Sequence, residues 1–169
     1  MPKLQKQICL ACCLVLLTAC TAFRGGKAPD QRISKYFTFA EAVHSDYAKK
    51  HNLINYPKKR SVRKNIERTA KRMDDVRDLL GRPIVVTSWY RSRRVNDAVG
   101  GSDTSAHGDG LAVDFYLDPE NPQREFNKIA NSRLSFDQLI YYPRGHRAHI
   151  GFRKKKSDER REIRRSGRR

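Results

Sequence analysis

The chain has 169 residues, with 36 Lys and Arg against 18 Asp and Glu, and a formal net charge of +18 at pH 7. This length suits one compact domain with its own hydrophobic core rather than several domains. A basic composition is typical of nucleic-acid binding, but here the basic residues are spread along the chain and no recognition motif accompanies them. We therefore expect no nucleic-acid partner.

The N-terminus resembles a bacterial export signal. Lys3 and Lys6 precede an apolar run over residues 8–19, which is too short to span a bilayer comfortably. The run ends in Leu-Thr-Ala-Cys at Cys20, which resembles the lipobox of bacterial lipoproteins. That resemblance implies cleavage before Cys20 and acylation of its thiol and new amino group, which would hold the protein to a membrane. A plain secretory signal and an N-terminal anchor are the alternatives.

The residue after the lipobox indicates a location. Thr21, rather than Asp, follows Cys20, which resembles the outer-membrane class of lipoproteins in Gram-negative bacteria. We therefore expect a protein of the cell envelope, lipid-anchored at the outer membrane and facing the periplasm.

The cysteines all lie in the signal or at its end, at Cys9, Cys12, Cys13 and Cys20. The exported domain then has no thiol for a disulfide or for a metal. Any zinc site in that domain must be built from histidine and carboxylate side chains.

Four segments are expected along the chain: a signal peptide over residues 1–19, the lipidated cysteine and a tether over residues 20–35, a folded domain over residues 36–153, and a basic tail over residues 154–169. The tether has two glycines, a proline and few apolar residues, which is typical of a linker. The tail is almost wholly charged, which predicts disorder and contact with anionic envelope polymers.

The first part of the domain is expected to be helical. Thr38 is placed to cap a short helix, and residues 61–80 show the clearest helical pattern. Its apolar positions recur at intervals of three and four residues and predict one buried stripe, formed by Val62, Ile66, Thr69, Met73, Val76 and Leu80. Gly81 is placed to end this helix and Pro83 to prevent its resumption.

The rest of the domain is typical of strands with one more helix. β-Branched and aromatic residues over 84–90 predict a central strand. Further strands are expected over residues 111–116, 136–142 and 147–152, with a helix near residues 123–130. The predicted class is α+β, with a small, mainly antiparallel sheet and flanking helices.

Two of these strands carry polar side chains suited to metal binding. Alternation within residues 111–116 places Asp114 away from Val and Phe, and an acid in such a strand is costly to desolvate without a partner or a metal. His107 lies just before this strand, and His149 lies in the strand over residues 147–152. If the two strands share a sheet, the three side chains converge, and two imidazoles with one carboxylate form a zinc set that leaves a position open for water. The alternative is a His–Asp hydrogen bond with an unrelated second histidine.

The wider pattern resembles a known family. The run Ser105-x-His107-x-x-Gly110-x-Ala112-x-Asp114 is similar to the Ser-x-His-x-x-Gly-x-Ala-x-Asp signature of the zinc D-Ala-D-Ala carboxypeptidases, which include phage endolysins and D,D-dipeptidases. Further blocks resemble the family in the same order: Ser-Trp-Tyr-Arg-Ser at 88–92, Val-Asn-Asp-Ala-Val-Gly-Gly-Ser at 95–102, Phe-Asp-Gln-Leu-Ile at 136–140 and His-Ile-Gly-Phe at 149–152. The likeness covers residues 36–153 and implies a hedgehog/DD-peptidase-like fold.

The resemblance implies a role for each matching residue. His107, Asp114 and His149 would bind Zn²⁺, which activates water and polarises the scissile carbonyl. Arg91 would hold a substrate carboxylate or carbonyl oxygen and steady the charge that develops in the reaction. Ser105, the first residue of the signature, would contact the substrate.

The general base is where the chain departs from its relatives. Several of them have a carboxylate three residues before the last histidine ligand, and this chain has His146 there. An imidazole titrates near neutrality, so His146 is the expected base. Asp109 and Asp137 are carboxylate alternatives, and Tyr141 or Tyr142 can donate a proton. The opposite interpretation is that the base has been lost.

The expected function follows from the resemblance. Relatives cut the stem peptides of peptidoglycan, either at a D-Ala-D-Ala terminus or, in some endolysins, between L-Ala and D-Glu. We therefore expect a zinc peptidase of the cell envelope. The alternative is a non-catalytic, zinc-containing lipoprotein that binds the cell wall.

Overall fold

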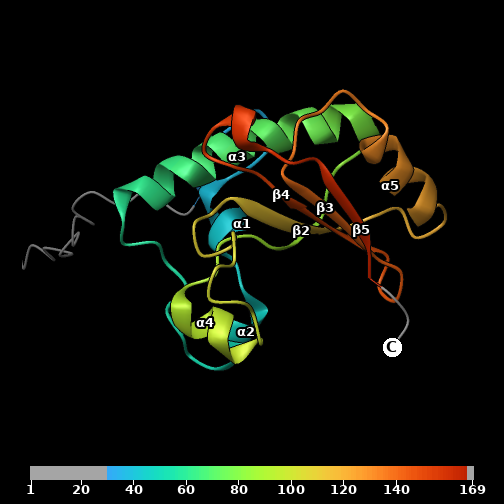
Figure 1. The fold of residues 1–169 in the computed structure, drawn as a ribbon. Helices are drawn as coiled ribbons and strands as arrows, with labels where there is room; N and C mark the ends of the chain where they lie inside the picture. The colour runs from blue at the N-terminus through green and yellow to red at the C-terminus, as the bar shows by residue number, and fades with distance from the viewer. Residues whose placement is uncertain (1–29, 167–169) are drawn as a thin grey trace, which may run out of the picture.

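The computed structural model describes residues 30–166, which form one five-stranded sheet with helices packed against it. Figure 1 shows the long helix α3 along one side of the sheet, with α5 next to the C-terminal end of α3. The predicted α+β class is confirmed.

The helices are α1 (Phe39–Val43), α2 (Asp46–Lys50), α3 (Arg60–Leu80), α4 (Arg93–Ala98), α5 (Pro122–Ala130) and the short 3₁₀ helix η1 (Lys156–Asp158). The strands are β1 (Val86–Ser88), β2 (Ala112–Tyr116), β3 (Gln138–Tyr142), β4 (Arg147–Gly151) and β5 (Glu162–Arg165). They lie in the order β1-β2-β4-β3-β5, and β3 and β5 form the one parallel pair of this sheet within residues 30–166.

The signals at the helix ends act as predicted. Thr38 Oγ1 accepts a hydrogen bond from Glu41 N at 3.3 Å, and Glu41 Oε2 accepts one from Thr38 N at 2.7 Å, so α1 begins with a capping box. Gly81 ends α3 in the left-handed conformation, with φ of 75°. The buried stripe of α3 is also confirmed for Val62, Ile66, Thr69, Met73 and Val76.

The hydrophobic core lies between α3, α5 and one face of the sheet. Strand alternation sends Val113 and Phe115 of β2 into this core, together with Ala148 and Ile150 of β4, and all four are fully buried. The residues between them in β2 and β4, such as Asp114 and His149, therefore lie on the opposite face of the sheet. That face carries the polar side chains described below.

The strand predicted over residues 84–90 is not central. β1 lies at an edge of the sheet, pairs only with β2, and its register shifts between Val86 and Ser88. After β1 the chain leaves the sheet: Trp89 is fully buried in the core, and Tyr90 N donates to Ala42 O at 2.9 Å. The aromatic residues that suggested a central strand therefore pack beneath the N-terminal helices instead.

The prediction of a disordered tail from residue 154 is wrong as far as residue 166. This segment forms η1 and β5, and β5 pairs with β3. Its charges have oppositely charged partners in the domain: Asp137 accepts from Arg160 at 2.8 Å and from the preceding Arg153 at 2.7 Å, and Glu159 accepts from Arg72 of α3 at 2.9 Å. Composition alone does not distinguish charges that repel one another from charges that have partners elsewhere in the fold.

Within residues 30–166, no helix has the length and apolar character needed to cross a membrane. The predicted signal peptide, Cys20 and most of the tether lie outside the described residues. They remain predictions from the sequence.

We predict that Asp137→Asn loosens the segment over residues 153–166, because the amide loses the charge that holds Arg153 and Arg160. Burial raises the pKa of Asp137, but the hydrogen bonds from Arg160 and Arg153 outweigh it and lower that pKa below its usual range. The ion pairs therefore persist above the usual carboxylate pKa of about 4 and are lost only as the pH falls well below it.

The measurement is limited trypsin digestion of the folded protein with mass spectrometry. Cleavage after Arg160 and Arg161 should rise several-fold in Asp137→Asn. Asp158→Asn is the control, because the Asp158 side chain bonds only to the neighbouring Ser157 within the described residues. Equal cleavage of wild type and both variants would contradict the anchoring role of Asp137.

Candidate metal centre

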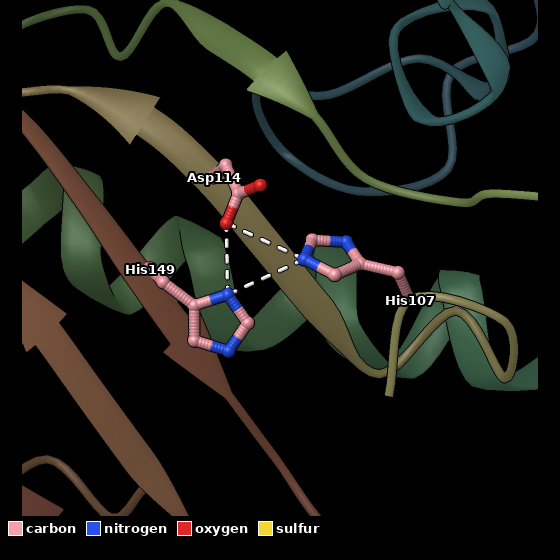
Figure 2. Close-up of side chains that lie close together, drawn as sticks. All are labelled: His107, Asp114 and His149. Atoms are coloured by element: carbon pink, nitrogen blue, oxygen red, sulfur yellow. Dashed lines mark hydrogen bonds and ion pairs between the residues drawn. The ribbon is translucent and has the colours of Figure 1, made fainter. Parts of the chain in front are cut away.

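Three side chains from separate parts of the chain converge on one point. Figure 2 shows the two imidazole rings and the carboxylate of His107, Asp114 and His149 directed towards one another. His107 Nε2 lies 3.3 Å from His149 Nδ1 and 3.3 Å from Asp114 Oδ1, and His149 Nδ1 lies 2.8 Å from Asp114 Oδ1. In residues 30–166 this is the one group of three or more such side chains close enough to share an ion.

The sheet places two of the three side chains. Asp114 of β2 and His149 of β4 are directly opposite in an antiparallel pair, where Cα atoms lie about 4.5–5.5 Å apart. Both residues alternate with core residues, so both side chains leave the sheet on the face away from α3. The condition stated from the sequence, that the two strands share a sheet, is therefore met.

The loop before β2 delivers His107. The His107 carbonyl accepts hydrogen bonds from Arg91 N at 3.2 Å and from Gly110 N at 3.1 Å. Gly110 has φ of 70°, and a Cβ there would lie 2.5 Å from Ile66 Cγ1 of α3. The loop therefore packs against α3 at a distance and in a conformation that favour glycine.

One hydrogen bond fixes the tautomer of His107. His107 Nδ1 lies 2.6 Å from the carbonyl oxygen of Trp89, which can only accept, so Nδ1 carries the proton. The lone pair of Nε2 is then directed at Asp114 and His149, as in metal-binding histidines whose second nitrogen is held by a carbonyl. Burial lowers the pKa of His107, which keeps its ring neutral at pH 7.

Arg91 and Ser88 support the carboxylate of Asp114. Arg91 Nη2 donates to Asp114 Oδ2 at 2.5 Å, and Arg91 Nε donates to Ser88 Oγ at 2.8 Å. Asp114 Oδ1 is left facing the histidines. Burial by itself raises the pKa of Asp114, but the interactions with His107 and His149 outweigh it and hold the pKa below its usual range.

This donor set fits a metal ion. Ligand atoms at about 2.0–2.1 Å from a tetrahedral ion lie about 3.3 Å from one another. The three separations here, 2.8, 3.3 and 3.3 Å, are close to that value. A neutral imidazole, an ionised carboxylate and a second imidazole thus form a candidate metal site with three protein ligands.

The site opens into a cleft of about 1060 Å³, at the upper end of the roughly 300–1000 Å³ typical of ligand sites. The sheet contributes Tyr142 of β3 and Arg147 of β4 to its lining, and the segment after β4 contributes Lys154. The cleft therefore has room for a peptide and is bordered by cations.

The structure brings most of the predicted site residues to this cleft. Arg91 and Ser105 line it together with the three candidate ligands. His146 does not: it lies in the turn between β3 and β4, its side chain is exposed, and it is not among the lining residues. Its carbonyl accepts from Leu117 N at 2.7 Å, which holds it at the far end of β2, roughly 10 Å along the chain from His149.

The alternatives for proton transfer are also separated by the fold. Asp109 and Tyr142 line the cleft. Asp137 lines it too, but its carboxylate is held by Arg153 and Arg160. Tyr141 packs in the core, with its ring centroid 5.2 Å from that of Phe126. Asp109 and Tyr142 are therefore the available acid and base groups of this set.

Sequence reasoning missed the groups that hold the ligands in place. Nothing in the sequence marks the Trp89 carbonyl as the partner of His107, or Ser88 as the support of Arg91. Arg147 was not assigned a role, although strand alternation places it on the same face as His149.

We predict that the chain binds one zinc ion and that Asp114→Asn weakens zinc binding by at least about 100-fold, more than outer partners of metal ligands usually contribute. Competition with a chromophoric chelator measures the affinity, and circular dichroism checks folding. Affinity should fall on acidification, because protons compete for the histidine nitrogens. Asp109→Asn is the control, since Asp109 lines the cleft outside the ligand set. Unchanged affinity in Asp114→Asn would rule out this site.

Comparison with known proteins agrees with the geometry. A model of the Peptidase M15 family matches residues 35–151, more than half of the chain, and this span includes His107, Asp114 and His149. Among curated proteins no match is found. The matched span also holds β1 to β4, including the two strands that carry Asp114 and His149. The chain therefore belongs to the Peptidase M15 family, the D-Ala-D-Ala carboxypeptidase-like metallopeptidases that its motifs resemble.

Proposed function

We propose that the chain is a zinc-dependent peptidase that hydrolyses the stem peptides of peptidoglycan, as a D-Ala-D-Ala carboxypeptidase or an endopeptidase, at the cell envelope. The observation that carries the proposal is the convergence of His107, Asp114 and His149 in an open cleft of an M15 domain. Membership of this family supports peptides of peptidoglycan as the substrate class.

Zinc is the ion that the donor set favours. Two imidazole nitrogens and one carboxylate oxygen are ligands of catalytic zinc sites, in which three protein ligands leave a position for water. All four cysteines lie at or before Cys20, so thiolate does not compete for the ion within residues 30–166. When bound in such a site, zinc supplies a water of pKa near 7 and a Lewis acid for the scissile carbonyl.

Arg91 is proposed to hold the carbonyl oxygen of the scissile bond. Ser88 and Asp114 engage Nε and Nη2, which fixes the guanidinium beside the ligand set. Arg91 Nη1 has no hydrogen-bond partner within residues 30–166, so it is free to donate to an oxygen that gains negative charge in the transition state. Ser105, which lines the cleft, is proposed to contact the substrate backbone.

Proton transfer is assigned to groups that line the cleft. Burial raises the pKa of Tyr142, and the nearby charge of Asp114 adds to the effect, so the phenol keeps its proton and can donate it to the leaving amine. Asp109 lines the same cleft and its side chain is exposed, so its carboxylate is the proposed acceptor of the proton from the attacking water. His146 is left out of this scheme because it lies outside the cleft.

The location at the envelope rests on the N-terminal sequence. The lipobox-like run before Cys20 supports a lipid anchor, and Thr21 supports the outer membrane of a Gram-negative bacterium, facing the periplasm. A peptidase tethered there would meet peptidoglycan directly. We also propose that the basic residues of the C-terminal segment contact anionic envelope polymers.

We predict that the zinc-loaded wild type releases product from purified muropeptides and that chelation abolishes the reaction. His107→Ala should lower the rate by at least about 100-fold, because it removes a ligand. His146→Ala should stay within about twofold of wild type, as surface substitutions usually do. Chromatography of the digests with mass spectrometry measures the rates and identifies the bond that is cut.

Two results would contradict these assignments. Zinc bound by wild type without product from any muropeptide would support the non-catalytic wall-binding alternative. Activity lost in His146→Ala, with zinc still bound, would return His146 to the mechanism.

We predict that Cys20→Ser releases the protein from the membrane fraction of expressing Gram-negative cells and prevents incorporation of labelled palmitate. Cys13→Ser is the matched control, since Cys13 lies inside the apolar run and should leave both properties unchanged. Membrane association of Cys20→Ser equal to that of wild type would exclude the lipid anchor. Fractionation with immunoblotting measures the distribution.

A further inference from the structure

Six cationic side chains border the cleft: Arg91, Arg147, Arg153, Lys154, Arg160 and Arg164. Four of the six are paired with an acid. Asp114 holds Arg91, Asp137 holds both Arg153 and Arg160, and Glu162 holds Arg164. Within residues 30–166, Arg147 and Lys154 are the two without an acidic partner. A cation without a partner beside a catalytic site is available to an anion of the substrate.

Arg147 is placed next to the candidate ligands. It lies two residues before His149 on β4, on the same face of the sheet, so the two Cα atoms are about 7 Å apart. Opposite it on β3 stands Tyr142, which also lines the cleft. In the turn before it, Gly145 leaves room for the guanidinium, because a Cβ there would lie 3.2 Å from Arg147 Nε.

Lys154 is less directly placed. It lies five residues after His149, beyond the end of β4 and in the segment that leads to η1. Any anion that it binds is therefore farther along the cleft from the candidate ligands.

We propose that Arg147 binds a carboxylate of the substrate and thereby selects acidic peptides; this inference rests on the proposed peptidase function. An extended peptide advances about 3.3–3.6 Å per residue. The Arg147 guanidinium lies beside Gly145, so a carboxylate within its reach is a residue or more from the bond that is cut, on the side toward the β3–β4 turn. A guanidinium binds such a group through two parallel hydrogen bonds.

Arg147 is better suited to this task than Arg91. Arg91 donates from Nε to Ser88 and from Nη2 to Asp114, and its positive charge is paired with the Asp114 carboxylate, so it is less available to a second carboxylate. Arg147 makes no side-chain hydrogen bond within residues 30–166, and its whole donor set is available. Arg91 is therefore assigned to the carbonyl oxygen of the scissile bond, and Arg147 to the carboxylate of the substrate.

The carboxylate has two possible sources, the free C-terminus of a D-Ala-D-Ala peptide or an acidic side group next to an L-Ala–D-Glu bond. The test uses two peptide pairs that differ only in carboxylate against amide: a D-Ala-D-Ala peptide with a free or amidated end, and an L-Ala–D-Glu peptide against its D-Gln analogue. Both kcat/KM and calorimetric binding are measured for wild type, Arg147→Gln and Arg147→Lys. Lys154→Gln and Arg144→Gln are controls, and Arg144 is an exposed turn residue that does not line the cleft.

Wild type should favour the carboxylate form of one pair by about 10- to 100-fold, the usual worth of a hydrogen bond to a charged group. Arg147→Gln should lose this preference with the amide form unaffected, and Arg147→Lys should keep part of it. The pair that shows the effect identifies the source of the carboxylate.

Three results would overturn the inference. They are an equal loss on the carboxylate and amide forms in Arg147→Gln, a preference erased by Lys154→Gln instead, or no carboxylate preference in wild type. If wild type cuts none of the four peptides, the proposed peptidase function fails, and the binding data still decide the role of Arg147.

Discussion

The pairing of Asp114 with His149 across β2 and β4 is the constraint on which the site depends. A register shift of one residue would turn one of these side chains into the core and leave the ligand set incomplete. The register is fixed by Val113 and Phe115 on β2, which must face the helical layer together with Ala148 and Ile150 on β4. The hydrophobic pattern that folds the sheet therefore also aligns the candidate ligands.

The faces of the strands and the buried side of α3 were predictable from the sequence, because both depend on local periodicity. Alternation in β2 and β4 shows which side chains leave the core, and the spacing of apolar residues in α3 shows its buried stripe. Long-range partners were not predictable in the same way. The ion pairs of Asp137 with Arg153 and Arg160 order a segment that composition alone assigns to disorder, and a turn residue such as His146 is placed by main-chain contacts that its own side chain does not reveal.

Arg91 and Arg147 both line the cleft but differ in their partners. Arg91 donates to both Asp114 and Ser88, so it keeps the Asp114 carboxylate ionised and oriented in a partly buried site. Arg147 stays free at the same cleft. The ligand set is therefore charge-balanced, whereas Arg147 and Lys154 leave unpaired positive charge at the rim of the cleft within residues 30–166. Under the proposed function, this charge is where a preference among substrates would arise.

The most direct test of this account is X-ray absorption spectroscopy at the zinc edge of the zinc-loaded protein. The account predicts nitrogen and oxygen ligands at about 2.0–2.1 Å, scattering from two imidazole rings, and no sulfur. A shell with fewer than two imidazoles, or one that contains sulfur, would contradict the assignment of His107, Asp114 and His149 as the ligand set.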